Sequence, residues 1–422
     1  MEIPSQRTMP QRFHGLDAVR AAALLLGVLL HTAEGFLPKQ IPTALAQRSI
    51  DALPFVLGLH YIHIFRMSSF FLIAGFFGCL LWHREGSVGF IRNRLGRILL
   101  PLVLGWLLFD PMITCVAIWQ ARVKAAAMAA RAPETSLWHA TLSAFTTGEV
   151  FRDRFPLEHL WFLYYLLLMY ALVLCLRWMC GKWANGARRI ADTVFRTVLE
   201  SWWGTICIAV PLTGAFYHMA PSRGLRTPHG LTPDKTVLLA YFIFFVIGWF
   251  LFRQPDLLRI LEGRALRSSV VRVVAGIWPL ALLAHTANTA ARLTRMETLS
   301  NSAAYALAMV LVTFGFIGIF LRWMSTPRPV VRYLSDSAYW IYLAHYPLVT
   351  ALLVALAPWP VHWSVKIPII VMGSLAILLL SYHFLIRYSW IGMLLSGPRR
   401  ASATHIAEVY ANPSRPSCAS LT

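Results

Sequence analysis

The chain has 422 residues, of which 58% are hydrophobic and only 13% are charged. A soluble globular chain carries about 25% charged residues, so the composition excludes a soluble enzyme, a disordered chain and a disulfide-rich secreted module. On a soluble domain the net charge of +20 would indicate a nucleic-acid partner, but membrane proteins collect Lys and Arg in their cytoplasmic loops. We therefore predict a multi-pass membrane protein that lies in the lipid bilayer and binds no nucleic acid.

Hydropathy along the chain predicts an all-α fold, a bundle of about ten transmembrane helices. A span needs about 20 consecutive apolar residues, and such runs lie near 17–37, 61–82, 98–119, 159–180, 202–220, 236–252, 271–291, 302–323, 336–357 and 367–390. An even number of spans places both termini on one side of the membrane. Because basic residues cluster in the connections 83–97, 181–200 and 253–270 and in both tails, that side is predicted to be the cytoplasm.

The first predicted span holds the sharpest set of polar residues. Arg20 and His31 are eleven positions apart, which on a helix returns to within roughly 20° of the same face at a rise of about 16.5 Å. One stripe of this helix would therefore carry Arg20 near the cytoplasmic surface and His31 deeper in the bilayer. Asp17 precedes the pair, and Glu34 follows one turn beyond His31, where it could orient the imidazole. The alternative is that Arg20 is an end anchor and His31 a packed histidine of the bundle.

The second predicted span carries three ionisable residues on one face. His60, His63 and Arg66 recur every three residues, and an Arg with two His on a helix in lipid must face protein or water. Two His at this spacing could chelate a metal ion, but no third ligand is fixed by the spacing and no zinc-protease motif occurs. We therefore predict no metal site.

Two later spans add further polar positions. The fourth span opens with His159 and Trp161, and the ninth carries Tyr342 and His345 one turn apart near its middle. Single residues of this kind usually serve packing. Ionisable groups buried in four separate spans are harder to explain in that way, because each is costly in lipid.

Together these motifs resemble the membrane acyltransferase type 3 family. They are LDxxR followed by ten residues and His, FRMxxFFLIAGFF, Arg-x-x-Arg followed by Pro, HLWFL and SxxxYxIYLxH, spread from Leu16 to about His345. The resemblance implies a ten-helix enzyme of the bacterial inner membrane. Such an enzyme takes an acyl group, succinyl or acetyl, from cytoplasmic acyl-CoA and delivers it to a hydroxyl of a periplasmic or cell-envelope glycan. Acyl-CoA would be a cosubstrate, and no cofactor would be bound permanently.

The resemblance also implies roles for individual residues. Arg20 and His31 match the family's Arg-x10-His pair, in which the histidine is the essential catalytic residue. Arg94 and Arg97 match its Arg-x-x-Arg, which is associated with acyl-CoA, and Arg92 lies beside them at the cytoplasmic mouth. The remaining matches lie within family motifs and are expected to bind substrate or support the site: His63, Arg66, His159, Trp161, Tyr342 and His345.

The chemistry of the residues agrees with that activity. Transfer of an acyl group from a thioester to a hydroxyl needs a base, and histidine titrates near neutral pH. It also needs donors for the developing oxyanion, and Arg suits the phosphates of CoA. We divide the chain into a cytoplasmic N-terminal segment at 1–16, a transmembrane acyltransferase domain at 17–395 and a cytoplasmic disordered tail at 396–422.

The sequence also contains features of two other functions. His229 and Asp234 form an H-x4-D string like that of glycerolipid acyltransferases, but Pro233 interrupts it and it falls in a predicted periplasmic loop. A transporter or flippase without catalysis would also place Arg, His and Glu inside spans. Transporters more often show internal repeats and broken helices in matching halves, which are not evident here. The oligomeric state, the acyl group and the acceptor are left open by the sequence.

Overall fold

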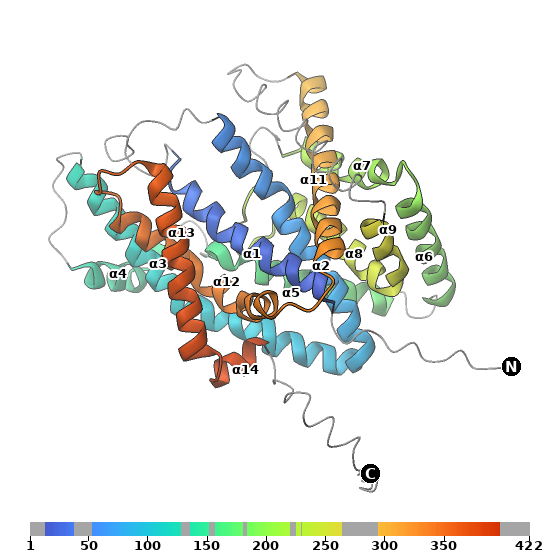
Figure 1. Cartoon of the computed structure of the whole chain (residues 1–422), viewed down its shortest axis with the longest axis horizontal. Helices are drawn as coiled ribbons and strands as arrows, with labels where there is room; N and C mark the ends of the chain where they lie inside the picture. Colours follow the sequence, from blue (N-terminus) through green and yellow to red (C-terminus); the bar gives the residue numbers. More distant parts are fainter. Residues whose placement is uncertain are drawn as a thin grey trace, which may run out of the picture.

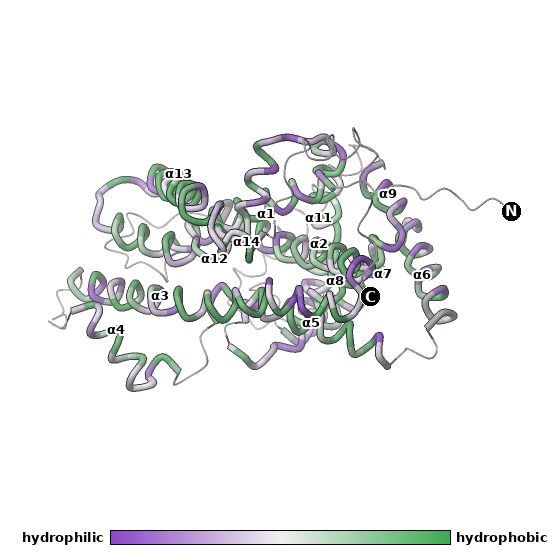
Figure 2. The backbone as a smooth tube through the Cα atoms, turned by 90° about the horizontal axis from the view of Figure 1, so that it is seen from below, coloured by the Kyte–Doolittle hydropathy of each residue, from purple (hydrophilic) through white to green (hydrophobic). Residues whose placement is uncertain are grey.

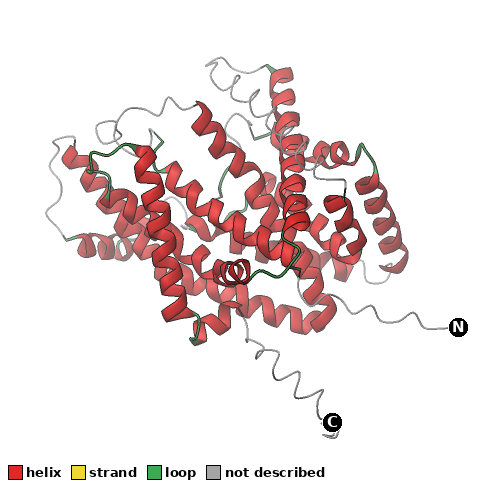
Figure 3. Ribbon diagram, viewed as in Figure 1, coloured by secondary structure: helices red, strands yellow, loops and turns green. Residues whose placement is uncertain are grey.

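The computed structural model of the chain describes residues 13–37, 53–127, 136–151, 157–179, 184–219, 225–228, 230–263 and 294–396. Across these ranges the protein consists of helices and connecting turns, with no strand (Figure 3). The predicted all-α class is therefore confirmed. The terminal segments 1–12 and 397–422 lie outside the described residues, so the domain boundaries stay predictions.

The long helices follow the predicted spans. They are α1 (His14–Glu34), α2 (Leu53–Arg94), α3 (Leu100–Ala127), α5 (Trp161–Met179), α8 (Lys235–Arg253), α11 (Arg295–Trp323), α12 (Pro329–Ala355) and α13 (Trp363–Ser381). Shorter elements join them: the π-helical turns η1 (Leu95–Leu99) and η6 (Tyr382–Ile386), the 3-10 turns η2 (Glu149–Phe151), η3 (Glu158–Leu160) and η5 (Pro255–Leu257), and the helices α4 (Leu137–Thr146), α6 (Ala184–Glu200), α7 (Gly204–Tyr217), α9 (Leu258–Gly263) and α14 (Trp390–Ser396).

Seven helical stretches in the described part of the chain are long and apolar enough to cross a membrane. One of them, Gly58–Ala126, has a kink at Gly86 and covers two of the predicted spans. The span predicted at 202–220 corresponds to α7, whose 14 residues fall short of the roughly 20 that a span needs. The span predicted at 271–291 lies outside the described residues. The count of ten and the side of the termini therefore stay predictions. The long helices are apolar along most of their length (Figure 2).

Two segments predicted as connections are themselves helical. In 83–97 the helix is interrupted only at Gly86, whose φ of 64° is a left-handed conformation that glycine adopts at no steric cost. The chain then stays helical through η1 into α3. In 181–200 the helix α6 forms, and it is tied to the end of α8 by an ion pair between Asp192 and Arg253. Arg is a good helix former, so a cluster of basic residues does not by itself predict a loop. Such a cluster is better used to predict which side of the membrane a segment faces.

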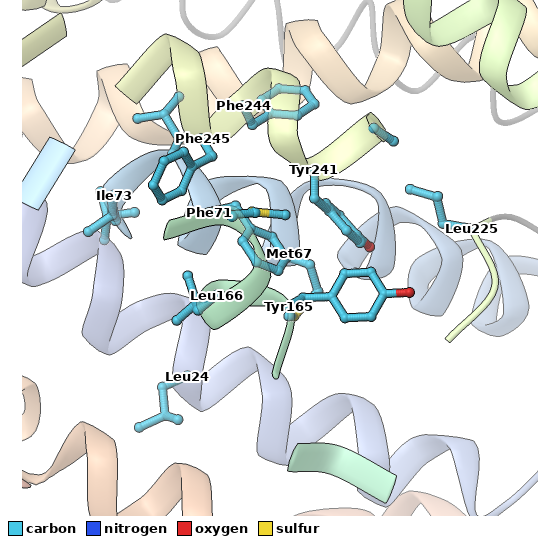
Figure 4. Close-up of a cluster of buried hydrophobic side chains, with 14 of the residues drawn as sticks. Leu24, Met67, Phe71, Ile73, Tyr165, Leu166, Leu225, Tyr241, Phe244 and Phe245 are labelled. Carbon is cyan, nitrogen blue, oxygen red and sulfur yellow. The ribbon is translucent and has the colours of Figure 1, made fainter. Parts of the chain in front are cut away.

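α1 lies in the middle of the bundle and contacts α2, α11, α12 and α13 (Figure 1). On one side of it, α2 packs along α8. The core between them is aromatic (Figure 4): Phe71 of α2 stacks on Tyr241 of α8 with ring centroids 4.7 Å apart. Met67, Phe244 and Phe245 lie around this pair and are almost completely buried. This packed side forms one wall of the site described below.

Two glycines allow α2 and α8 to approach closely. A Cβ at Gly75 would meet the carbonyl oxygen of Phe245, and a Cβ at Gly248 would meet the carbonyl oxygen of Leu72, both closer than real Cβ atoms are found. Small residues at such crossings let helix backbones touch, which is a main source of attraction between helices in lipid.

We expect Gly248→Ala to lower the stability of the folded protein by about 1–3 kcal/mol, because the methyl group must push the two backbones apart. Gly373→Ala in α13 is the matched control, since open space lies where its Cβ would stand. The control should leave the stability unchanged or raise it by at most about 1 kcal/mol. Thermal unfolding of the detergent-solubilised variants measures both. Equal melting temperatures for the two variants would contradict the close contact.

Candidate active site

A cavity of about 690 Å³ lies between α1, α2, α5, α12 and η1, within the range of pockets that hold small molecules. It gathers residues that are far apart in the sequence. Eleven of the thirteen predicted site residues line it: Arg20, His31, Glu34, His63, Arg66, Arg94, Arg97, His159, Trp161, Tyr342 and His345. Asp17 and Arg92 do not. The structure thus brings the predicted residues together, while the role of each stays a prediction.

Contacts between α1 and α12 set the length of the cavity. At one end, Nη2 of Arg20 donates to Oγ of Ser335 at 2.6 Å and to its main-chain oxygen at 2.8 Å. At the other end, the ring of His31 lies 5.4 Å from that of His345 and 5.3 Å from that of Tyr346. The two contacts are separated by ten or eleven residues on each helix. The helices therefore run parallel, and Arg20 and His31 line one cavity at levels about 16 Å apart.

Asp17 supports the Arg20 end from outside the cavity. Its Oδ1 lies 3.6 Å from Nη2 of Arg20 and accepts a hydrogen bond of 3.2 Å from Oγ of Ser335. Because Asp17 and Arg20 of α1 both bond to Ser335 of α12, this cluster fixes the register of the two helices. Arg92, by contrast, has an exposed side chain.

His31 and Glu34 are paired at the far end of the cavity. Nδ1 of His31 lies 2.9 Å from Oε2 of Glu34. If Nδ1 carries the proton and donates it to the carboxylate, Nε2 at the other edge of the ring is the basic nitrogen. A carboxylate in this position orients the imidazole and stabilises the imidazolium that forms when the ring accepts a second proton.

The three other histidines of the cavity are bonded to main-chain carbonyls. Nε2 of His159 lies 2.9 Å from the oxygen of Leu343, and Nδ1 of His345 lies 2.7 Å from the oxygen of Tyr342. His63 makes the same kind of contact at 3.2 Å. A neutral carbonyl stabilises an imidazolium less than a carboxylate does. Among these four histidines, only His31 on α1 has a hydrogen bond to a carboxylate within the described residues.

Arg66 brings a positive charge to the middle of the cavity wall. Its side chain is buried, with 8% of the residue exposed, and its Nη1 occupies the space where a Cβ at Gly27 would stand. Its Nε has no hydrogen-bond partner among the described residues. A buried guanidinium with donors to spare is suited to an anionic or strongly polar group of a ligand.

Trp161 and Tyr342 have packing contacts that account for their positions. The ring of Trp161 lies 5.4 Å from that of Tyr165 in an edge-to-face arrangement. The hydroxyl of Tyr342 donates to the main-chain oxygen of His159 at 2.7 Å. That bond joins α12 to the 3-10 turn η3, which precedes α5 and in which Glu158 has a left-handed φ of 40°.

The arginines of the Arg-x-x-Arg motif lie at the end of the cavity near Arg20. Arg94 donates to the hydroxyl of Tyr170 at 3.2 Å, and its guanidinium lies 5.0 Å from the centre of that ring. Arg97 belongs to the π-helical turn η1, and its main-chain oxygen accepts a hydrogen bond of 2.6 Å from Tyr339. Arg94 and Arg97 both line the cavity, so two positive charges stand at this end.

The sequence assigned no role to Ser335, Tyr346 or Tyr170, although Ser335 is the first residue of the SxxxYxIYLxH motif. Ser335 holds Arg20 across 315 positions of the chain, and no local spacing predicts such a contact. Tyr346 follows the predicted His345 directly, and its ring stacks on His159 at 5.4 Å. Tyr170 lies in an apolar span without any motif that would mark it.

No metal site is seen in the described ranges. Within them, no three His, Cys, Asp or Glu side chains converge so that they could hold a metal ion. Asp234 of the H-x4-D string has a structural role. Its Oδ1 accepts hydrogen bonds from the amides of Thr236 and Val237 and so caps the N-terminus of α8. His229 lies outside the described residues.

Comparison with known proteins agrees with the motifs. The family model described as "Acyltransferase domain" matches residues 13–386. Curated proteins and solved structures gave no match. The matched region covers nearly the whole chain and includes every residue of the cavity up to Tyr346. The protein is therefore a member of the membrane acyltransferase type 3 family.

Proposed function

We propose that this membrane acyltransferase takes an acyl group from acyl-CoA on the cytoplasmic side and transfers it to a hydroxyl of a glycan in the cell envelope. His31 would be the base that accepts the hydroxyl proton. The observation that carries the proposal is the pair of His31 and Glu34 in a cavity whose other end holds two arginines. The cavity thus offers a base at one end and an anion-binding mouth at the other.

The dimensions of the cavity fit the donor. The phosphates of CoA would rest on Arg94 and Arg97, because guanidinium groups bind phosphate through paired hydrogen bonds. The pantetheine arm would run along the cavity, which is about 16 Å long between the levels of Arg20 and His31. The thioester would then reach His31, with Arg66 placed to stabilise the developing oxyanion.

A finer resemblance points to one acyl group and one acceptor. The residues of the FRM…FF and HLWFL motifs resemble those of glucans biosynthesis protein C, the succinyltransferase of osmoregulated periplasmic glucans. On this basis we propose succinyl-CoA as the first donor to test, acetyl-CoA as the second, and the bacterial inner membrane as the location.

The discriminating experiment is the release of free CoA by the purified protein. Full-length protein in proteoliposomes is supplied with succinyl-CoA or acetyl-CoA and a glucose oligosaccharide, and thiol release is followed together with acylation of the sugar by mass spectrometry. Acyltransfer predicts both signals. A transporter or flippase without catalysis would release no CoA from either donor.

We expect His31→Ala to lower the rate of acyl transfer by about 10² to 10⁴, the usual contribution of a general base. Expression and melting temperature should change little. His139→Ala is the matched control, since His139 is exposed on α4 and lines neither the cavity nor its mouth. Near-normal acylation of the sugar by His31→Ala would exclude the mechanism.

Glu34→Gln tests whether the carboxylate acts through the imidazole. The amide can still accept a hydrogen bond from Nδ1, but it does not stabilise an imidazolium. We expect kcat to fall about 10²-fold while the KM for acyl-CoA stays within a factor of two. Glu34→Asp, which keeps the charge, should recover part of the loss. A change in KM alone would assign Glu34 to donor binding instead.

Arg97→Ala and Arg94→Ala should each raise the KM for acyl-CoA by roughly 10-fold or more, since a hydrogen bond to a charged group contributes about 1.5–3 kcal/mol. Arg328→Ala, at an exposed position before α12, serves as the control and should leave KM unchanged. Steady-state kinetics over a range of donor concentrations measures the effect. Unchanged KM values for both cavity variants would remove the phosphate-binding role.

A further inference from the structure

A second, smaller cavity lies against the pair of His31 and Glu34. Its volume is about 160 Å³, and it is formed by the ends of α1, α3 and α12. Three residues line both cavities: His31, Glu34 and Tyr346. The second cavity adds polar side chains of its own, those of Gln120 and Lys124 on α3 and Thr350 on α12.

The second cavity continues the line of the first in the direction away from the arginines. Along α12, the main cavity extends from Ser335 to Tyr346, whereas the second is lined from Tyr346 to Ala357. Just past α1 it reaches Gly35, where an added Cβ would require the side chain of Leu353 to shift. The main cavity also reaches this level, at Leu37. The second cavity therefore extends past the main cavity along α12, and the two meet beside the imidazole.

The helix α3 runs in the same direction. Near its start, the main-chain oxygen of Arg97 accepts a hydrogen bond from Tyr339 of α12, and a Cβ at Gly105 would lie 3.4 Å from Leu343. Lys124 stands in the last turn of α3. The polar side chains of the second cavity thus lie at the end opposite Arg94 and Arg97.

We propose that this second cavity is the acceptor subsite, where the reacting hydroxyl of a polyhydroxylated sugar meets His31. The inference rests on the proposed acyl-CoA-dependent function and adds the place of the acceptor. A volume of 160 Å³ equals roughly five water molecules at liquid density, so it admits one end of a sugar chain and excludes CoA. An ammonium, an amide and a hydroxyl at the end of apolar helices are groups that hydrogen-bond to sugar hydroxyls.

The transfer needs no reactant besides the acyl-CoA donor and the sugar acceptor. The hydroxyl oxygen of the sugar attacks the thioester carbon while Nε2 of His31 takes the hydroxyl proton. A carbon–oxygen ester bond forms, and the carbon–sulfur bond of the thioester breaks. The proton then passes from His31 to the thiolate, which leaves as CoA. Because donor and acceptor would occupy different cavities, neither has to leave before the other binds.

Filling the second cavity is the direct test. Ala117, on α3, lines it, and Ala117→Trp should block the acceptor without touching the donor. Leu108→Trp is the matched control, because Leu108 lies on the same helix, is 57% exposed and lines neither cavity. Each variant is expressed in cells that lack the gene, and the acylation of their envelope glycans is measured by mass spectrometry. Titration of the purified full-length protein with CoA measures the donor side.

We expect Ala117→Trp to lower glycan acylation at least about 10-fold while its Kd for CoA stays within a factor of two, and Leu108→Trp to change neither. Lys124→Met and Thr350→Val leave the packing volume nearly unchanged and should each lower acylation, by up to about 10-fold for a lost hydrogen bond. Full acylation by all three cavity variants, or an equal loss of CoA affinity, would overturn the acceptor subsite. If cells lacking the gene lose no acyl substituent at all, the proposed function fails instead.

Discussion

The parallel alignment of α1 and α12 is the constraint on which the site depends. Arg20 bonds to Ser335 at one level, and His31 meets His345 and Tyr346 about 16 Å further along. A shift of the register by one residue would place on the facing surface side chains that point about 100° away, and these contacts would be lost. The α1 stripe that carries Arg20 and His31 faces a cavity only because α12 holds it there. Residues of α2 and α5, which are far apart along the chain, then close the cavity.

Much of the helical content and part of the site could be predicted from local patterns. The shared face of Arg20 and His31 follows from the geometry of a single helix, and hydropathy located the long helices. Contacts such as that between Arg20 and Ser335 join residues 315 positions apart, and no spacing within one helix contains them. The helical state of 83–97 was missed because Arg-rich sequence permits a helix as readily as a loop, and only Gly86 breaks it. The second cavity arises between three helix ends, so no motif marks it.

The four histidines that line the cavity differ in their hydrogen-bond partners. Inside a membrane protein each polar group needs a partner, because lipid offers none. Three of the cavity histidines meet main-chain carbonyls, which fix the orientation of the ring but stabilise a charged ring less than a carboxylate does. His31 meets a carboxylate, which also favours the charged ring. The hydrogen-bond partner therefore distinguishes His31 from the three other histidines of the cavity.

The wall shared by the two cavities has a further consequence for the membrane as a barrier. His31, Glu34 and Tyr346 line both cavities, so the two cavities meet at these three side chains. Moving one elementary charge across a membrane potential of 100 mV releases about 2.3 kcal/mol, so an open path at this level would favour the leakage of ions. The same three side chains must therefore admit an acyl group to an acceptor and still insulate the cell against the leakage of ions.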